Sequence, residues 1–271
     1  MRIFSATIRK LVRRPATWVT LGLLVGLLGL VFLAVGATAN QVGDRQGGRE
    51  ALLLLTFPAA YGFVLSFIIG LGGLFAVIYG ATVAGSEWSW GTLKNAVARG
   101  ESRSRYVVMT FVGVALLTGV GLVIAFILGV LLAVVGATIA GVSTSGITDA
   151  TVVGKLPEQL ARGWLAIVEE GAIGFAVATI ARSQLAGIGA GIALYFGEGF
   201  ASIFLPDIVR WLPFDAATAI LGASAGGGFS SGGGGTRLPL DSGTAMVVVV
   251  AWLLGSIAVA SLVTERAEIG G

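Results

Sequence analysis

Long apolar runs alternate with short polar segments along the chain, and six of the runs are long enough to cross a bilayer as helices. A helix needs about 20 apolar residues to cross a hydrocarbon core of about 30 Å. The runs predict spans at residues 16–39, 57–83, 106–138, 163–181, 185–205 and 243–263. The pattern indicates an all-α membrane protein with six transmembrane helices in a single domain, residues 1–271.

The third run, residues 106–138, is the longest. As a helix it would be about 50 Å long at roughly 1.5 Å per residue, so we expect it to tilt, break or protrude. Gly119 and Gly121 mark the favoured position for a break, although glycines in membrane helices also permit close packing between neighbouring helices.

The first 14 residues have an amphipathic pattern that differs from the spans. Apolar residues at positions 3, 4, 8, 11 and 12 share one side of a helix, and basic residues occupy the remainder: Arg2, Arg9, Lys10, Arg13 and Arg14. This pattern predicts a helix in the headgroup plane of an anionic leaflet, with Pro15 at the bend into the first span.

A basic start, an apolar run and the sequence Ala37-Thr38-Ala39 also fit a cleaved signal peptide. We favour an uncleaved span because the run exceeds 20 residues, whereas a signal-peptide core has roughly 7–15.

A charged segment, Glu87–Arg105, separates the second and third predicted spans. Trp90, Leu93 and Val97 recur at helical spacing, which predicts a short amphipathic helix. Ser86 is the expected N-cap of this helix, with Glu87 in its first turn and a stop at Gly100. The simplest interpretation is a solvated connector between two spans.

The order of residues in this segment gives it a second interpretation. An acidic residue, Gly91-Thr92-Leu93, a hydrophobic turn and the basic tail Arg99–Arg105 together resemble the coupling segment of ABC-2-type transporter permeases. Chain length, span plan, a basic N-terminal helix and short helices before the last span are similar too. One difference is Gly100, where many members of that family have a proline.

The resemblance implies a cytoplasmic coupling helix that docks into a groove on a separate ATP-hydrolysing subunit. The residues expected to make that contact are Glu87, Trp88, Trp90, Gly91, Thr92 and Lys94. It also implies an exporter in which two permease subunits, identical or as a sister pair, associate with two ATPase subunits.

Between the fifth and sixth spans, the apolar residues of Asp207–Leu221 are interrupted by Pro213, which predicts two short helices at the extracellular surface. The following stretch, Gly222–Gly235, predicts a flexible connector. It does not fit a phosphate-binding loop, because no Gly-Lys-Ser/Thr follows it and no strand precedes it. Another polar stretch, Gly141–Arg162, predicts a loop between the third and fourth spans.

Composition agrees with a membrane protein. Hydrophobic residues make up 56% of the chain, charged residues 11%, and the mean hydropathy is +0.95; soluble domains have about 25% charged residues. The chain has no cysteine and no histidine, which excludes disulfides, thiolate or imidazole metal sites and Ser-His or Cys-His catalysis. Without a nucleotide-binding motif the chain is not expected to be an enzyme or to bind a cofactor or metal, so ATP and magnesium are expected on the partner ATPase.

The distribution of basic residues predicts the orientation. Six spans place both termini on one side, and 11 of the 17 Lys and Arg residues fall on that side, together with Glu87–Arg105. The positive-inside rule therefore predicts cytoplasmic termini in a cell (inner or plasma) membrane. It also explains the net charge of +3 without a nucleic-acid partner, and leaves membrane lipids as expected partners.

Three acidic residues fall inside predicted spans: Glu169 and Glu170 near the middle of the fourth, and Glu198 in the outer half of the fifth. An ionised acid at such a depth costs about 2.5–3.5 kcal/mol. They either line a polar path for a cationic or amphipathic substrate or form hydrogen bonds between helices. They also suggest an alternative function, a proton-coupled secondary transporter, and a nontransporting scaffold or sensor subunit is a further alternative.

Two pairs of glycines at four-residue spacing, Gly22 with Gly26 and Gly187 with Gly191, permit close approach of helices in the first and fifth spans. In the family that the chain resembles these spans commonly face the dimer axis, so the glycines are candidate dimer contacts.

Overall fold

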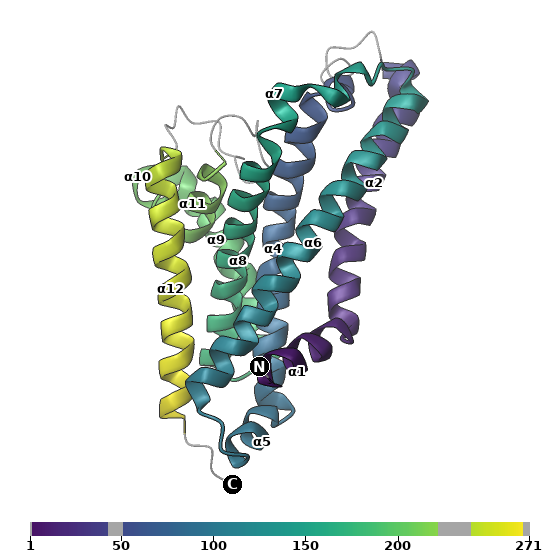
Figure 1. The fold of residues 1–271 in the computed structure, drawn as a ribbon. Helices are drawn as coiled ribbons and strands as arrows, with labels where there is room; N and C mark the ends of the chain where they lie inside the picture. Colours follow the sequence, from purple (N-terminus) through teal and green to yellow (C-terminus); the bar gives the residue numbers. More distant parts are fainter. Residues whose placement is uncertain (1, 43–50, 222–239, 268–271) are drawn as a thin grey trace.

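The computed structural model describes residues 2–42, 51–221 and 240–267, and the regular structure within these ranges is helical (Figure 1). Six of the described helices are long and apolar enough to cross a membrane: α2 (Pro15–Val42), α4 (Ala59–Ser89), α6 (Arg103–Ala140), α8 (Leu156–Ala181), α9 (Gln184–Phe204) and α12 (Ser242–Arg266). The prediction of six spans is confirmed, and the chain is a multi-pass α-helical membrane protein.

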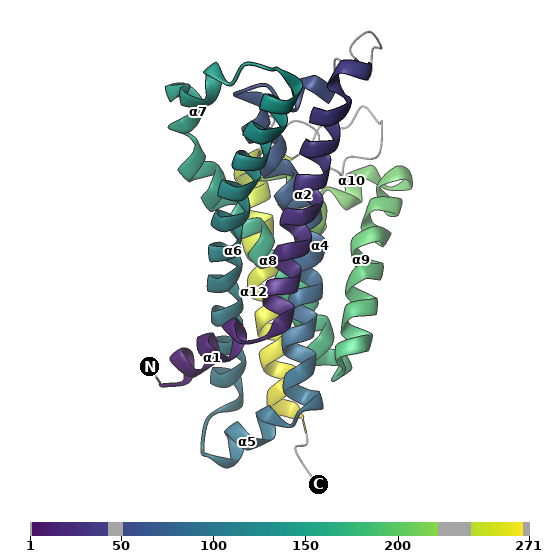
Figure 2. The same cartoon turned by 90° about the vertical axis from the view of Figure 1, so that its right-hand side faces the viewer.

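The two ends of the bundle differ. At one end, α1 (Arg2–Val12) lies across the long helices, and α5 (Thr92–Ala98) lies beyond it (Figures 1 and 2). At the other end lie the short helices η1 (Ser145–Thr148), α7 (Ala150–Val153), α10 (Pro206–Val209) and α11 (Pro213–Ala219). We call these the α1/α5 end and the α7/α10 end. Arg103 at the start of α6 donates to the carbonyl of Ala267 at 2.7 Å, so both ends of the described chain lie at the α1/α5 end.

Helices α4 and α8 form the centre of the bundle, and they pack more extensively against each other than any other pair of described helices. Their backbones approach closely, because a Cβ atom at Gly80 would collide with the carbonyl oxygen of Gly171. Close backbone contact lets dispersion forces act along the whole crossing, which is the main source of helix association in a membrane.

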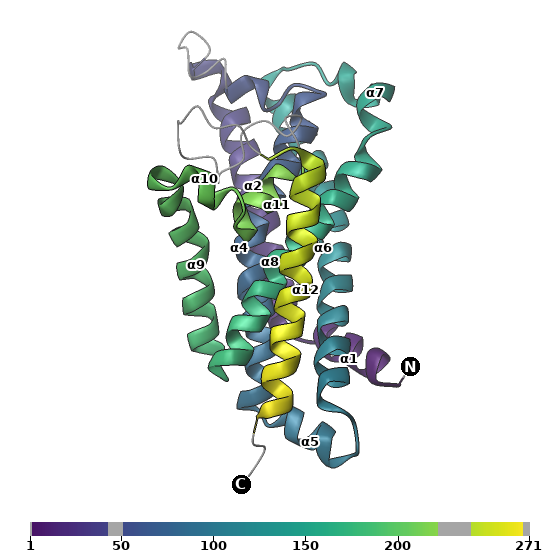
Figure 3. The ribbon, with the colours of Figure 1, turned by 90° about the vertical axis from the view of Figure 1, so that its left-hand side faces the viewer.

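The remaining spans surround this central pair. Helices α2 and α6 cross near the α7/α10 end, where a Cβ atom at Gly36 would lie 2.7 Å from the Gly136 carbonyl oxygen. Helix α9 packs on α4 and α8 at one edge, and α12 packs on α8 and α6 at another (Figure 3). Their outward side chains are apolar and exposed, as expected for surfaces that face lipid; examples are Leu185, Phe200, Phe204, Val247 and Leu254.

Several sequence predictions need correction or refinement. Helix α6 continues for 38 residues without a break, and Gly119 instead accommodates the indole of Trp164. The stretch predicted as the loop Gly141–Arg162 holds η1, α7 and the first turns of α8. Two short helices between the fifth and sixth spans are confirmed as α10 and α11. The predicted connector Gly222–Gly235 lies outside the described residues.

Candidate functional site in the α4–α5 hairpin and the bundle centre

Helix α4 extends past the predicted membrane boundary and forms a hairpin with α5, which we call the α4–α5 hairpin (residues 86–100). The reversal occurs at Gly91, whose φ of 64° lies in the left-handed region that glycine adopts readily. Ser86 and Glu87 therefore belong to the last turns of α4. The prediction that Ser86 caps the amphipathic helix is wrong, because the apolar run of α4 continues into polar residues that are buried by tertiary contacts.

Glu87 is buried at the base of the hairpin, with an exposed fraction of 5%. Its carboxylate accepts hydrogen bonds from Lys10 Nζ at 2.5 and 2.8 Å, from Arg14 at 3.1 Å and from the Tyr106 hydroxyl at 2.6 Å. The Thr92 hydroxyl donates to the same carboxylate. These five residues, which we call the Glu87 cluster, join α1, α4, α5 and α6 and the link between α1 and α2.

Arg14 extends the cluster in two directions. Its guanidinium donates to Ser86 Oγ at 2.8 Å, and its carbon Cζ lies 5.1 Å from the ring centre of Trp90. On the other side of the hairpin, Arg182 lies 5.4 Å over the ring of Trp88, which joins the α8–α9 turn to the end of α4. A cation over an aromatic face is stabilised by the quadrupole of the ring.

The electrostatics of the cluster favour one arrangement of α1. Two cations, Lys10 and Arg14, share one carboxylate, so removing Glu87 would leave the buried guanidinium of Arg14 and the partly exposed ammonium of Lys10 without a compensating charge. Breaking a buried ion pair by deleting one partner costs about 3–5 kcal/mol. The cluster therefore fixes the position of α1 against the hairpin.

The structure divides the six predicted contact residues into two groups. Glu87 and Thr92 point into the cluster, and Trp88 is half-buried. Trp90, with 62% of its surface exposed, and Lys94 project from the hairpin, and Gly91 forms the turn between them. The residues that a partner could reach on the hairpin form an exposed group: Ser89, Trp90, Lys94, Asn95, Ala98, Arg99 and Gly100.

Sequence reasoning missed three members of the cluster, Lys10, Arg14 and Tyr106. The first two were assigned to the lipid headgroups because they lie on the polar side of an amphipathic helix. Their spacing of four residues is the signal that was present, since it places both on one face of a helix or its immediate extension. The acid that they face lies 77 and 73 positions away in sequence, which no local pattern indicates.

The three acids inside the bundle differ in their surroundings. Glu198 accepts hydrogen bonds from the backbone N–H groups of Phe214 at 3.3 Å and Asp215 at 2.5 Å, so it caps the start of α11. Both carboxylate oxygens of Glu169 and Oε2 of Glu170 are buried and have no hydrogen-bond partner among the described residues. Glu170 lies against Gly73 of α4, where a Cβ atom would collide with the carboxylate.

The structure brings these acids into one neighbourhood. The carboxyl groups of Glu169 and Glu170, on α8, lie within electrostatic range of Glu198, on α9. A cleft of about 310 Å³ between α4, α9 and the α10–α11 region is lined by Glu198, Tyr195 and Asp215. Tyr195 donates to the carbonyl of Gly70 at 2.6 Å.

The two pairs of glycines have different positions. Gly22 and Gly26 lie on the exposed face of α2, with no other atom within 4 Å of a Cβ placed there. Gly187 packs on Ala178 of α8, and Gly191 packs on Val77 of α4. The α9 pair is thus covered by helices of its own chain, whereas the α2 pair is open to a neighbour.

No protein-family model matches the chain, and no curated protein matches it in sequence. The similarity to ABC-2-type permeases therefore stays a prediction, and a function has to be argued from the hairpin and the acids.

Proposed function

We propose that this chain is the membrane-spanning permease subunit of an ATP-binding-cassette exporter. In this proposal the bundle forms the substrate path, and the α4–α5 hairpin receives movement from a separate ATPase subunit. The observation that carries the proposal is the Glu87 cluster. It ties a protruding hairpin to α1 and α6 through buried charged contacts, while Trp90 and Lys94 remain exposed.

Such a hairpin can transmit displacement efficiently. A shift at Trp90 or Lys94 would move Glu87 through α4 and Thr92, and Glu87 is bonded to α1 through Lys10 and to α6 through Tyr106. Helix α4 in turn packs along α8, which carries Glu169 and Glu170. The movement would thus reach the helices that surround the acids, and packed interiors respond to it by switching between discrete arrangements.

The expected orientation places the hairpin in the cytoplasm, where an ATPase is available. This orientation is expected because Lys and Arg are in excess on the side of the termini. ATP and magnesium would bind to the partner, two copies of which would serve two permease chains. The exposed Gly22 and Gly26 face of α2 is the surface we assign to the contact between the permease chains.

The test is whether the exposed hairpin residues bind an ATPase encoded by an adjacent reading frame. We expect the double variant Trp90→Ala/Lys94→Glu to lose copurification with that ATPase and to lose export that depends on ATP. The matched control is Trp211→Ala/Lys155→Glu, which changes the same residue types, also exposed, near the α7/α10 end. Equal copurification of both variants with the ATPase would refute the proposal.

A second candidate, a proton-coupled secondary transporter, is favoured by one observation: both carboxylate oxygens of Glu169 and Oε2 of Glu170 are buried without a hydrogen-bond partner among the described residues. It predicts transport in proteoliposomes that hold the chain alone and a pH gradient, with loss of transport in Glu169→Gln/Glu170→Gln. Transport that needs the ATPase and ATP would instead support the exporter. No transport under either condition would favour a nontransporting scaffold or sensor subunit.

A further inference from the structure

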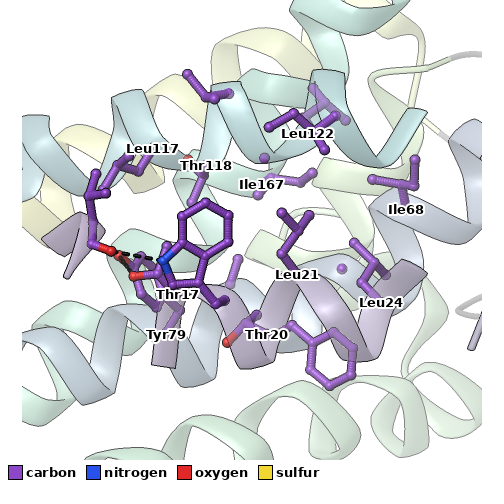
Figure 4. A pocket seen from close by; sticks show the side chains of 18 residues that line it. Thr17, Thr20, Leu21, Leu24, Ile68, Tyr79, Leu117, Thr118, Leu122 and Ile167 are labelled. Carbon is purple, nitrogen blue, oxygen red and sulfur yellow. Dashed lines mark hydrogen bonds between the residues drawn. The ribbon is translucent and has the colours of Figure 1, made fainter. Parts of the chain in front are cut away.

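A groove on the lipid-facing side of the bundle has no part in the proposed coupling. It lies between α1, α2, α4 and α6, with Ile167 of α8 in its floor (Figure 4). Its volume is about 200 Å³. Its floor is buried and consists of Leu24, Ile68, Ala76, Tyr79, Leu122 and Ile167. Its rim is exposed and includes Val12, Trp18, Val120 and Ile124, so the groove opens toward the surrounding lipid.

The walls of the groove present hydrocarbon. Thr17 bonds to the carbonyl of Leu11 at 2.7 Å and to the Tyr79 hydroxyl at 3.0 Å. The hydroxyls of Thr20 and Thr118 and the indole N–H of Trp18 donate to carbonyls of neighbouring turns in the same way. Because these donors are already bonded within the chain, an occupant gains nothing from polar groups, and the groove fits an apolar chain.

The dimensions of the groove suit one acyl chain. Its walls run along the helices for about 10 Å between Thr17 and Leu24 and about 16 Å between Ile68 and Tyr79, at roughly 1.5 Å per residue. Lipid tails extend in this direction in a bilayer. The volume is below the roughly 300–1,000 Å³ of sites that enclose a drug-sized ligand, so the groove holds part of an acyl chain and the rest of the chain stays in the bilayer.

Basic residues at the rim of the groove, on and next to α1, indicate what kind of lipid supplies the acyl chain. Arg9 and Val12 lie on α1, and Arg13 follows it directly. The N–H of Arg13 bonds to the carbonyl of Arg9 at 3.3 Å, so Arg13 lies beside Arg9, as residues four apart do on a helix. Val12 lines the groove, and both arginines are exposed and form no ion pair among the described residues. Lys10 and Arg14, by contrast, are held by Glu87.

We propose that the groove binds one acyl chain of an anionic phospholipid from the leaflet at the α1/α5 end, with Arg9 and Arg13 at its phosphate. A lipid tail that enters the groove moves from one apolar medium to another, so it gains little free energy there. The tail therefore determines where the lipid binds, and the headgroup determines which lipid is preferred. Each arginine near an anionic headgroup contributes about a fivefold preference. The bound lipid would add a contact to α1 beyond those of the Glu87 cluster, and the site does not depend on the exporter function.

The test uses the full-length chain in detergent, titrated with phosphatidylglycerol, phosphatidylcholine or oleate and observed by native mass spectrometry. We expect one tightly bound phosphatidylglycerol, with phosphatidylcholine bound more weakly. Arg9→Gln/Arg13→Gln should lower the preference for phosphatidylglycerol roughly 25-fold and leave phosphatidylcholine binding unchanged. Oleate binding as tight as that of phosphatidylglycerol would assign the site to free fatty acids and overturn the proposal.

A second variant tests the groove itself. Gly121 lines the groove with no atom within 4 Å of a Cβ placed on it, so Gly121→Leu should fill the space and abolish binding of the single lipid. The matched control is Gly189→Leu, on the exposed face of α9, where a Cβ is equally free of contacts. Gel filtration and thermal unfolding report whether both variants fold. Unchanged phosphatidylglycerol binding in folded Gly121→Leu would overturn the proposal.

Discussion

Glu87 at the hairpin and Glu169 in the bundle centre are both buried, yet their surroundings are opposite. Glu87 accepts hydrogen bonds from four side chains, two of which are cations. Glu169 has no partner for either oxygen among the described residues and lies in a neighbourhood of two further acids. Burial of an acid therefore does not indicate its role. A satisfied acid stabilises one arrangement of helices, whereas an unsatisfied acid reduces stability and marks a place where a ligand, water or proton is expected.

The largest change in stability is expected on substitution of Glu87. Glu87→Gln should lower the free energy of unfolding by about 3–5 kcal/mol, because Lys10 and Arg14 lose the charge that compensates them. Thermal and denaturant unfolding of the purified chain measure this effect. Glu158→Gln is the control, since Glu158, paired with Arg162 at 2.5 Å, has 63% of its side chain exposed, and this pair should contribute at most about 1 kcal/mol. Equal losses in the two variants would contradict a structural role for the cluster.

Substitution of Glu169 and of Glu198 in the bundle centre should change stability in opposite directions. Glu169→Met replaces a partnerless polar group with an apolar chain of similar length, and should raise stability by about 1–3 kcal/mol. Glu198→Met should lower it by a similar amount, because the N–H groups of Phe214 and Asp215 lose their acceptor. The same unfolding measurements decide the sign. Destabilisation in both variants would mean that Glu169 has a partner that is not a described residue of the chain.

A smaller loss of stability is expected on substitution of Gly91 at the turn of the hairpin. Gly91→Ala places a Cβ on a residue with φ of 64°, which costs about 1–2 kcal/mol although no neighbouring atom lies within 4 Å. Gly189→Ala provides the control, because its Cβ is equally free of contacts and its backbone is helical. Limited proteolysis of the hairpin and thermal unfolding measure the difference. A neutral Gly91→Ala would show that the hairpin does not hold the turn in this conformation.

The sequence predicted the spans and the two surface helices because apolar length and proline positions are local signals. Spans 16–39 and 185–205 begin within one residue of α2 and α9. Helix α4 ends at Ser89, beyond the predicted end of the second span at 83, since the burial of Ser86 and Glu87 depends on Arg14 and on Lys10 of α1.

The role of each acid was less predictable than its position. The place of Glu169 and Glu170 in the middle of the fourth apolar helix followed from sequence, and their burial is complete or nearly so. The bonds of Glu198 depend on where the chain returns after α10, which no spacing in α9 indicates. Likewise, Glu87 was expected to face a partner protein, and its four donors come from segments that the fold brings together.

The smallest change in stability is expected at an acid on the surface, Asp241. Asp241 is exposed at the start of α12 and accepts hydrogen bonds from the Thr244 hydroxyl at 2.6 Å and the Thr244 N–H at 3.0 Å. The hydroxyl bond, with the backbone bond, lowers the pKa of Asp241 below its ordinary value of 3.8. A lowered folded pKa means that this contribution to stability is complete above the ordinary pKa and is lost as the pH falls through the folded value.

Asp241→Asn isolates this contribution, because asparagine also caps a helix but does not titrate in this range. We expect the two proteins to have similar melting temperatures near pH 6, and the wild type to fall relative to the variant as the pH approaches about 3. The difference should be smaller than any effect above, since an exposed carboxylate remains hydrated whether or not it is bonded. A wild-type protein that gains stability relative to Asp241→Asn on acidification would have the wrong sign for a capping carboxylate, and would place Asp241 with the partnerless acids of the bundle centre.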